Sequence, residues 1–168
     1  RSGEFLASKL YEITPDIITL AKGLAGGVPI GALLTTHKEI FVAGDHGSTF
    51  GGNFLSTRAA LEVLEILEAY KDSGALDKTH IYFEEKLNQI VEKYPNVFEK
   101  ELGLGLMRGI RCKGDETLPK LLRAGFEAGV LLLRSGRNTL RFLPPLTITK
   151  DEINEGMRRL EDAISSLS

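Results

Sequence analysis

The chain has 168 residues, of which 42% are hydrophobic and 26% charged, and its formal net charge is −2. This composition is typical of a folded globular chain, since a disordered chain would be poorer in apolar residues. A nucleic-acid partner is not expected, because there is no basic excess. No membrane partner is expected either, because no apolar run approaches the ~20 residues that span a bilayer. The single cysteine, Cys112, excludes an intrachain disulfide and favours a reducing, cytoplasmic setting.

The first part of the chain is predicted to hold two short strands, glycine-rich loops and one helix. The apolar run 17–20 indicates a short buried strand, and 31–35 indicates a second. Asn53 can cap a helix over about 55–70, whose broad apolar surface predicts a largely buried helix. These elements cannot close a core alone, so we expect 1–68 to belong to a domain whose other strands are absent. The chain also opens without Met, which is consistent with a piece of a longer protein.

The second part, 69–168, is predicted to be a balanced α+β unit with its own apolar faces. Helical spacing of apolar residues predicts a helix over 76–94, which Pro95 ends. A change of pattern then predicts strands over 97–101, 104–112, 130–133 and 139–142, with a helix over 118–128 that Gly129 ends. Thr149 and Glu152 form a capping-box pattern at the start of the last helix.

Lys22 is the first candidate for chemistry, because it follows an apolar strand directly and precedes a glycine loop. Ligands of α/β proteins bind at such strand ends. A desolvated lysine becomes neutral more easily, and the neutral amine can attack an aldehyde to form a Schiff base. On position alone, the alternative is a strand-end lysine that points into water, as most lysines do.

Two further segments could bind anions. Residues 46–53 place Ser48, Thr49 and several glycine amides just ahead of a helix, which suits a phosphate dianion. The alternative is a simple helix-entry turn. Arg141 stands among apolar neighbours in a strand that two prolines end, and a half-buried guanidinium needs an anionic partner. That partner is either the carboxylate of a ligand or a structural Asp or Glu.

Other patterns carry no chemistry. The glycines from Gly103 to Gly109 miss the spacing of a dinucleotide-binding loop by one residue and indicate a turn and a strand. The three histidines and the cysteine lack metal-ligand spacing, so no metal site is predicted.

Taken together, the three candidate segments resemble the motifs of class III pyridoxal-phosphate aminotransferases. Residues 14–32 resemble the Schiff-base lysine segment of that family, 46–53 its phosphate loop, and 140–146 its carboxylate-binding motif. The three occur in family order, and the resemblance covers essentially the whole chain. One position departs from the family, since Phe54 stands where proline is usual.

The resemblance implies an α/β fold, the carboxy-terminal part of a fold-type I transferase. Residues 1–68 would be the end of the large cofactor domain, and 69–168 the small carboxy-terminal α+β domain. Lys22 would hold pyridoxal 5'-phosphate through a Schiff base and then move a proton between the substrate carbon and the cofactor.

The resemblance also implies the binding partners of the other candidates. Thr49, with Ser48 beside it, would bind the cofactor phosphate of the neighbouring subunit, so the active unit would be a homodimer with a shared active site. Arg141 would bind the α-carboxylate of the amino acid or 2-oxo acid substrate.

Within the family, the amino-acid sequence of residues 129–132 and 140–149 is most similar to the branch that transfers the amino group of N-acetylornithine to 2-oxoglutarate in arginine biosynthesis. Ornithine, succinylornithine and other ω-amino acids are alternative substrates, and a non-catalytic fragment that only packs or dimerises is a third possibility. The upstream half of the family is missing here. It supplies an Asp for the pyridine nitrogen, a stacking aromatic, a phosphate loop and a second carboxylate-binding Arg. We therefore expect the isolated chain to be inactive or nearly so.

Overall fold

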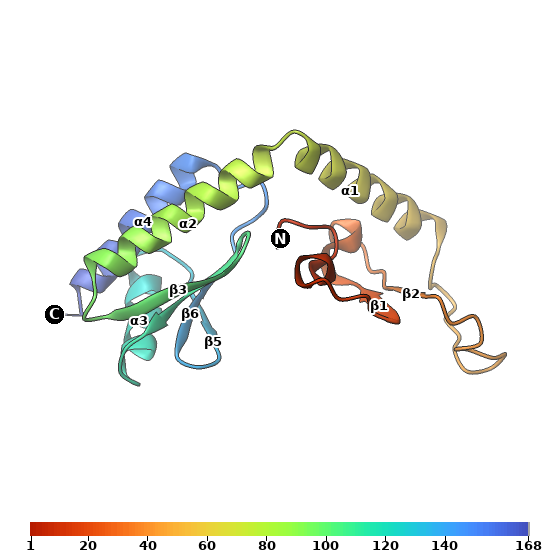
Figure 1. Ribbon diagram of the computed structural model, residues 1–168, viewed down its shortest axis with the longest axis horizontal. Coiled ribbons are helices and arrows are strands. Elements are labelled where there is room, and N and C mark those ends of the chain that lie inside the picture. The colour runs from red at the N-terminus through yellow and green to blue at the C-terminus, as the bar shows by residue number, and fades with distance from the viewer. Residues whose placement is uncertain (168) are drawn as a thin grey trace. The chain divides into compact units, whose positions relative to one another are not determined.

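The computed structural model describes residues 1–167 and divides into two compact units (Figure 1). The amino-terminal unit is Leu6–Ser73. The carboxy-terminal unit runs from Gly74 onward and also includes Arg1–Phe5. The first five residues join it because the Leu106 amide donates a hydrogen bond to the Arg1 carbonyl, with an N–O distance of 2.8 Å. The two units meet between Ser73 and Gly74, and the chain enters the amino-terminal unit only at Leu6. The division into domains after residue 68 stays a prediction.

The amino-terminal unit contains a two-stranded antiparallel sheet and one long helix. Its elements are η1 (Ala7–Tyr11), β1 (Ile17–Leu20), η2 (Lys22–Ala25), β2 (Ala32–Thr35) and α1 (Phe54–Asp72). Ile17 lies opposite Thr35 in the sheet. Asn53 caps α1 as expected, because its side-chain oxygen accepts a hydrogen bond from the Ser56 amide at 3.0 Å.

The burial expected for this unit is wrong. The α1 side chains of Leu61 and Ile66 are 53% and 57% exposed, and β1 alternates between exposed and half-buried residues. Within the unit only three residues are buried, which are Ala25, Ser56 and Ala60. Two strands and one helix offer too little surface to cover these apolar positions.

The carboxy-terminal unit is a four-stranded antiparallel sheet with three helices. Its elements are α2 (Ala75–Lys93), β3 (Phe98–Leu104), β4 (Met107–Cys112), α3 (Thr117–Glu127), β5 (Leu133–Ser135), β6 (Thr139–Phe142) and α4 (Lys150–Ser165). The strand order is β3-β4-β6-β5. None of the described helices is both long and apolar enough to cross a membrane.

The strand expected over 130–133 is mostly wrong, because β5 begins only at Leu133. The preceding residues close the end of α3 instead. The Val130 amide donates to the Gly125 carbonyl at 2.8 Å, and Gly129 has a φ of 76°. This is the 6→1 hydrogen bond of a glycine helix stop, and it takes the backbone group that a strand would have used.

The core of the carboxy-terminal unit lies between one face of the sheet and the helices (Figure 1). Ile110 and Leu140, paired across β4 and β6, are fully buried in it. Phe142 meets Phe83 of α2 edge to face, with ring centroids 6.1 Å apart. The other face of the sheet is named here the open face. From the register, its positions are Lys100, Leu102, Leu104, Met107, Gly109, Arg111, Leu133, Ser135, Thr139 and Arg141.

Candidate functional site

Lys22 lies at the sharp turn that ends β1. Its φ is 57°, in the left-handed region, where only four non-glycine residues of the described chain lie. The residue before it, Ala21, is extended, so the backbone reverses hand at the lysine. A left-handed non-glycine residue costs of the order of 1–2 kcal/mol. Such strain is concentrated at active sites and ligand clamps, which makes Lys22 a candidate on structural grounds as well.

The environment of Lys22 differs from the expected one in solvation. The residue is exposed, and no hydrogen bond or ion pair to its side chain occurs among the described residues. The expected desolvation is therefore absent here, because the two-stranded sheet has no cover at this end. The turn packs against α1, and its backbone approaches so closely that a Cβ built on Gly26 would lie 3.3 Å from the Val63 side chain.

In the loop ahead of α1, the side chain of Ser48 forms a hydrogen bond within the loop and that of Thr49 does not. Ser48 closes the loop, because its oxygen accepts a hydrogen bond from the Gly51 amide at 2.9 Å. A Cβ on Gly51 would lie 2.7 Å from that oxygen, so a larger residue there would displace the Ser48 side chain. The exposed Thr49 makes no side-chain hydrogen bond within residues 1–167. Both hydroxyls keep a free O–H donor, because Ser48 only accepts in its bond with Gly51.

Arg141 lies on the open face, in β6, opposite Gly109 of β4 and Leu133 of β5. Its Nε is buried and has no hydrogen-bond partner. Nor does its guanidinium form an ion pair with any carboxylate in the described part of the chain. A buried donor without a partner is costly, so Arg141 keeps capacity for an anionic partner.

Arg108 shows the opposite arrangement on the core side of the same sheet. It is 6% exposed and donates to Glu101 at 2.8 Å, to Glu84 at 2.6 Å and to the Gly105 carbonyl at 2.9 Å. This arginine fastens the β3–β4 hairpin to α2, and two carboxylates of the chain already neutralise its charge. A structural carboxylate was one of the two partners expected for Arg141. Carboxylates of the chain pair with Arg108 instead.

The predicted site residues are divided between the two units. Lys22, Ser48 and Thr49 belong to the amino-terminal unit, and Arg141 belongs to the carboxy-terminal unit. Among the described residues, no hydrogen bond joins Lys22 to the loop of Ser48 and Thr49. Sequence reasoning missed one residue of interest, Arg111, because only the strand register puts it on the same face as Arg141.

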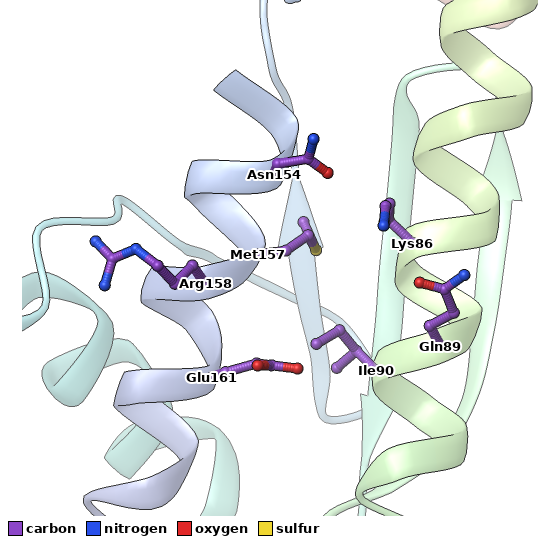
Figure 2. A pocket seen from close by; sticks show the side chains of 7 residues that line it. All are labelled: Lys86, Gln89, Ile90, Asn154, Met157, Arg158 and Glu161. Carbon is purple, nitrogen blue, oxygen red and sulfur yellow. The ribbon is translucent and has the colours of Figure 1, made fainter. Parts of the chain in front are cut away.

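A shallow pocket of about 210 Å³ lies between α2 and α4, and Figure 2 shows the side chains around it. It is lined by Lys86, Gln89, Ile90, Asn154, Met157, Arg158 and Glu161. Two of its charged side chains are already paired, since Arg158 bonds to Glu155 and Asp162, and Glu161 bonds to Lys93. The third, Lys86, lies over the ring of Tyr82. The pocket contains no predicted site residue and is not the candidate site.

Comparisons with known proteins agree with the three motifs. A profile of the family described as Aminotransferase class-III matches residues 1–164. The chain is 57% identical over 167 residues to the acetylornithine aminotransferase of Wolinella succinogenes. It is 42% identical over 165 residues to the acetylornithine aminotransferase of Streptococcus mutans. These alignments cover 99% and 96% of this chain but 42% of each relative, so the chain spans about two fifths of their length.

Solved structures show the same relationship. The acetylornithine aminotransferase of Elizabethkingia anophelis matches with a TM-score of 0.84 and 30% identity, over 99% of this chain and 45% of that one. The ornithine aminotransferase of Toxoplasma gondii matches with a TM-score of 0.85 and 29% identity, over 99% of this chain and 41% of that one. The fold is therefore that of a part of a pyridoxal-phosphate-dependent transferase, and the chain belongs to the class III aminotransferase family.

Proposed function

We propose that the protein of which this chain is a part is a pyridoxal-phosphate-dependent aminotransferase that moves the amino group of N-acetylornithine to 2-oxoglutarate. The observation that carries the proposal is the left-handed backbone of Lys22 at the end of β1. Its support in sequence is the identity to proteins named acetylornithine aminotransferase over nearly the whole chain. Arginine biosynthesis, in the cytoplasm, is the corresponding physiological setting.

The residues present fit the cofactor of the family. When bound, pyridoxal 5'-phosphate supplies an aldehyde for the lysine and an electron sink for the carbon that loses its proton. Lys22 is a primary amine on a strained turn, which the Leu24 amide closes by donating to the Ala21 carbonyl at 3.2 Å. Its Nζ can hold the cofactor and afterwards, once released, carry a proton to and from the substrate carbon.

Thr49 is the proposed phosphate ligand of the loop. Its hydroxyl can donate to a phosphate oxygen, while Ser48 keeps the loop closed through the Gly51 amide. The amino-terminal end of α1 follows within the same segment, and its positive end favours an anion. We propose that this loop serves the cofactor of a second copy of the chain, in a homodimer that shares its active sites.

Arg141 is the proposed ligand of the α-carboxylate. A planar guanidinium can bind a carboxylate through two parallel hydrogen bonds, which fixes both distance and orientation. Its unpartnered, buried Nε agrees with this role. Positioning the substrate in this way lets the proton transfer occur at a single carbon.

The proposal is tested by adding pyridoxal 5'-phosphate, reducing with borohydride and mapping the labelled peptide by mass. We expect Lys22 to be labelled more strongly than Lys9 and Lys38, the two lysines nearest to it in the sequence. A Lys22→Arg variant should lose that label and keep the others. Equal labelling of all three lysines in the longer parent protein would contradict the assigned role.

The substrate is tested on the longer parent protein by measuring transamination with N-acetylornithine, succinylornithine and ornithine. Ornithine is the main competitor, because several structural relatives are ornithine aminotransferases. We expect the highest kcat/KM for N-acetylornithine. The 168-residue chain itself should show no turnover, and normal turnover by it would contradict the need for an upstream half. A Lys22→Ala parent that is as active as the wild type would favour the non-catalytic alternative.

A further inference from the structure

Residues 1–5, named here the strap, lie against the turn of the β3–β4 hairpin before the chain enters the amino-terminal unit. The Leu106 amide in this turn donates to the Arg1 carbonyl at 2.8 Å. Gly105 makes the close approach possible, because a Cβ there would lie 2.8 Å from the strap backbone and would also meet the Arg1 carbonyl. The Arg1 side chain donates to the Pro144 carbonyl. The strap is therefore attached at the hairpin turn and at the segment after β6.

His80 of α2 lies under the strap. A Cβ built on Gly3 would lie 3.6 Å from the imidazole Cε1 and Nδ1 atoms, so the ring lies directly beside this glycine. His80 is only 7% exposed, and its buried Nε2 has no hydrogen-bond partner among residues 1–167. A neutral imidazole can leave one nitrogen as an unpaired acceptor, whereas an imidazolium has an N–H on both nitrogens and a charge. The closed strap therefore accommodates only the neutral ring.

The charges around His80 also oppose its protonation. Ionisable groups lie beside it on three elements, which are Asp77 and Glu84 on α2, Arg108 on β4, and Arg1 and Glu4 on the strap. Arg108 and the Arg1 amino group repel an imidazolium, and only Asp77 attracts it appreciably. Glu84 is already bonded to Arg108 at 2.6 Å. Burial is the largest cause, and together these effects lower the pKa of His80 from its ordinary value of 6.5.

His80 also lies near both connections between the two units. The strap ends where the chain enters the amino-terminal unit, between Phe5 and Leu6. The chain returns between Ser73 and Gly74, and α2 begins at the next residue. His80 lies in the second turn of α2, so a change at this one imidazole would act beside both connections.

We propose that His80 is a pH-sensitive latch that holds the strap closed while its imidazole is neutral and releases the strap when the ring is protonated. Protonation places a charge and a further N–H in a site without an acceptor, and lifting of the strap lets water reach the ring. The inference does not depend on the proposed function, because it needs neither cofactor nor substrate.

The direction of the pH dependence follows from linkage. With the strap lifted, the hydrated imidazole has its ordinary pKa of 6.5, whereas the closed strap lowers that pKa. The closed form is therefore fully favoured above pH 6.5 and loses stability as the pH falls from there through the lowered pKa.

The test is amide hydrogen exchange of the 168-residue chain between about pH 5 and pH 8, with each rate divided by that of an unstructured amide at the same pH. The Leu106 amide reports on the strap, because its acceptor is the Arg1 carbonyl. Its protection should fall about tenfold for each pH unit below 6.5, until the closed imidazole is itself protonated. The Leu87 amide, in the middle of α2, should remain far better protected at every pH. Equal protection of the two amides would mean global unfolding and would contradict the latch.

Three modified chains identify the titrating group. His80→Phe keeps a flat ring that cannot be protonated, so the protection of Leu106 should no longer depend on pH. His37→Phe is the matched control, because it removes an exposed histidine from the other unit and should keep the fall. Acetylation of the Arg1 amino group removes the other titrating group of the strap, whose pKa burial lowers, and should also keep the fall.

A reciprocal measurement leaves His80 unchanged and remains informative if His80→Phe does not fold. Gly105→Ala forces the strap away from the hairpin turn, so it must raise the pKa of His80 toward 6.5. NMR titration of the imidazole protons compares this pKa with that of the unmodified chain. The proposal is overturned if Leu106 protection does not change with pH, if His80→Phe keeps the fall, or if His37→Phe or the acetylated chain loses it. An unchanged pKa of His80 in Gly105→Ala would overturn it as well.

Discussion

Gly103 fixes the β3–β4 hairpin because no other residue fits its position. Its φ is 132°, and a Cβ there would lie 2.8 Å from the Arg108 Cα and also meet the Met107 carbonyl. Backbone atoms cannot yield as a side chain can, so we expect Gly103→Ala to lower the free energy of unfolding by about 2 kcal/mol or more. Gly136→Ala is the matched control, because a Cβ there meets nothing within 4 Å. Urea unfolding measures both, and equal losses would contradict the assignment.

Arg108 is predicted to be the most costly arginine to remove. Glu101, its partner, has a side chain only 8% exposed and would be left buried without a cation. Breaking such a pair costs about 3–5 kcal/mol. Arg123→Ala is the control, because its pair with Glu127 is exposed and contributes about 0–1 kcal/mol. If urea unfolding gave both variants the same stability, the Arg108 network would not fasten the hairpin.

Cys112 is predicted to be an unreactive thiol. Burial raises its pKa to about 11, and the residue is 4% exposed. Because only the thiolate attacks disulfide reagents, the native chain at pH 8 should react at least about 100-fold more slowly than the chain unfolded in urea. The reaction with a chromogenic disulfide measures both rates. Similar rates would mean that the β4 end opens readily, contrary to its buried position.

At the scale of elements, the start of α4 depends on a capping box in which Thr149 and Glu152 bond to each other's backbone amides. Thr149→Ala should cost about 1 kcal/mol, measured by thermal unfolding, whereas the exposed Thr147→Ala should cost little. The bonds from Thr149 lower the pKa of the Glu152 carboxyl. This contribution is therefore present above the unfolded pKa near 4.5 and is lost as the pH falls below it. A Thr149→Ala variant with unchanged acid sensitivity would contradict this account.

Elements whose bounds depend on neighbouring residues in the sequence were predicted well. The strands 17–20 and 139–142 and the capping box at Thr149 have the bounds expected from the sequence. Burial depends on partners far along the chain, and it was predicted wrongly for the helix over 54–72. The strand expected at 130–133 failed because Gly129 uses the following amide to end the preceding helix.

The candidate site was predictable only in its separate parts. Lys22, Thr49 and Arg141 follow from motifs, and their positions on a turn, a loop and a strand agree with the sequence. The distinction between Ser48 and Thr49 depends on a hydrogen bond to Gly51, which no pattern contains. The position of Arg111 beside Arg141 depends on the register of β4 against β6, which a single sequence does not specify.

At the scale of the whole molecule, two helices of equal length allow a direct comparison of the two units. α1 and α2 each have 19 residues. α1 buries only Ser56 and Ala60, whereas the buried residues of α2 are Leu76, His80, Phe83, Leu87 and Ile90. Isolated helices are marginal in water, and their stability in proteins comes mainly from packing of an apolar face. The carboxy-terminal unit should therefore remain folded while the amino-terminal unit opens.

Amide hydrogen exchange of the 168-residue chain tests this expectation. Central amides of α2 should exchange only through global unfolding of their unit, whereas those of α1 should exchange orders of magnitude faster. Equal protection of the two helices would contradict the comparison. The longer parent provides the decisive contrast, because the exposed apolar residues of α1, such as Leu61 and Ile66, need cover that this unit does not provide. Slowing of α1 exchange there, with α2 unchanged, would identify the upstream half as the source of that cover.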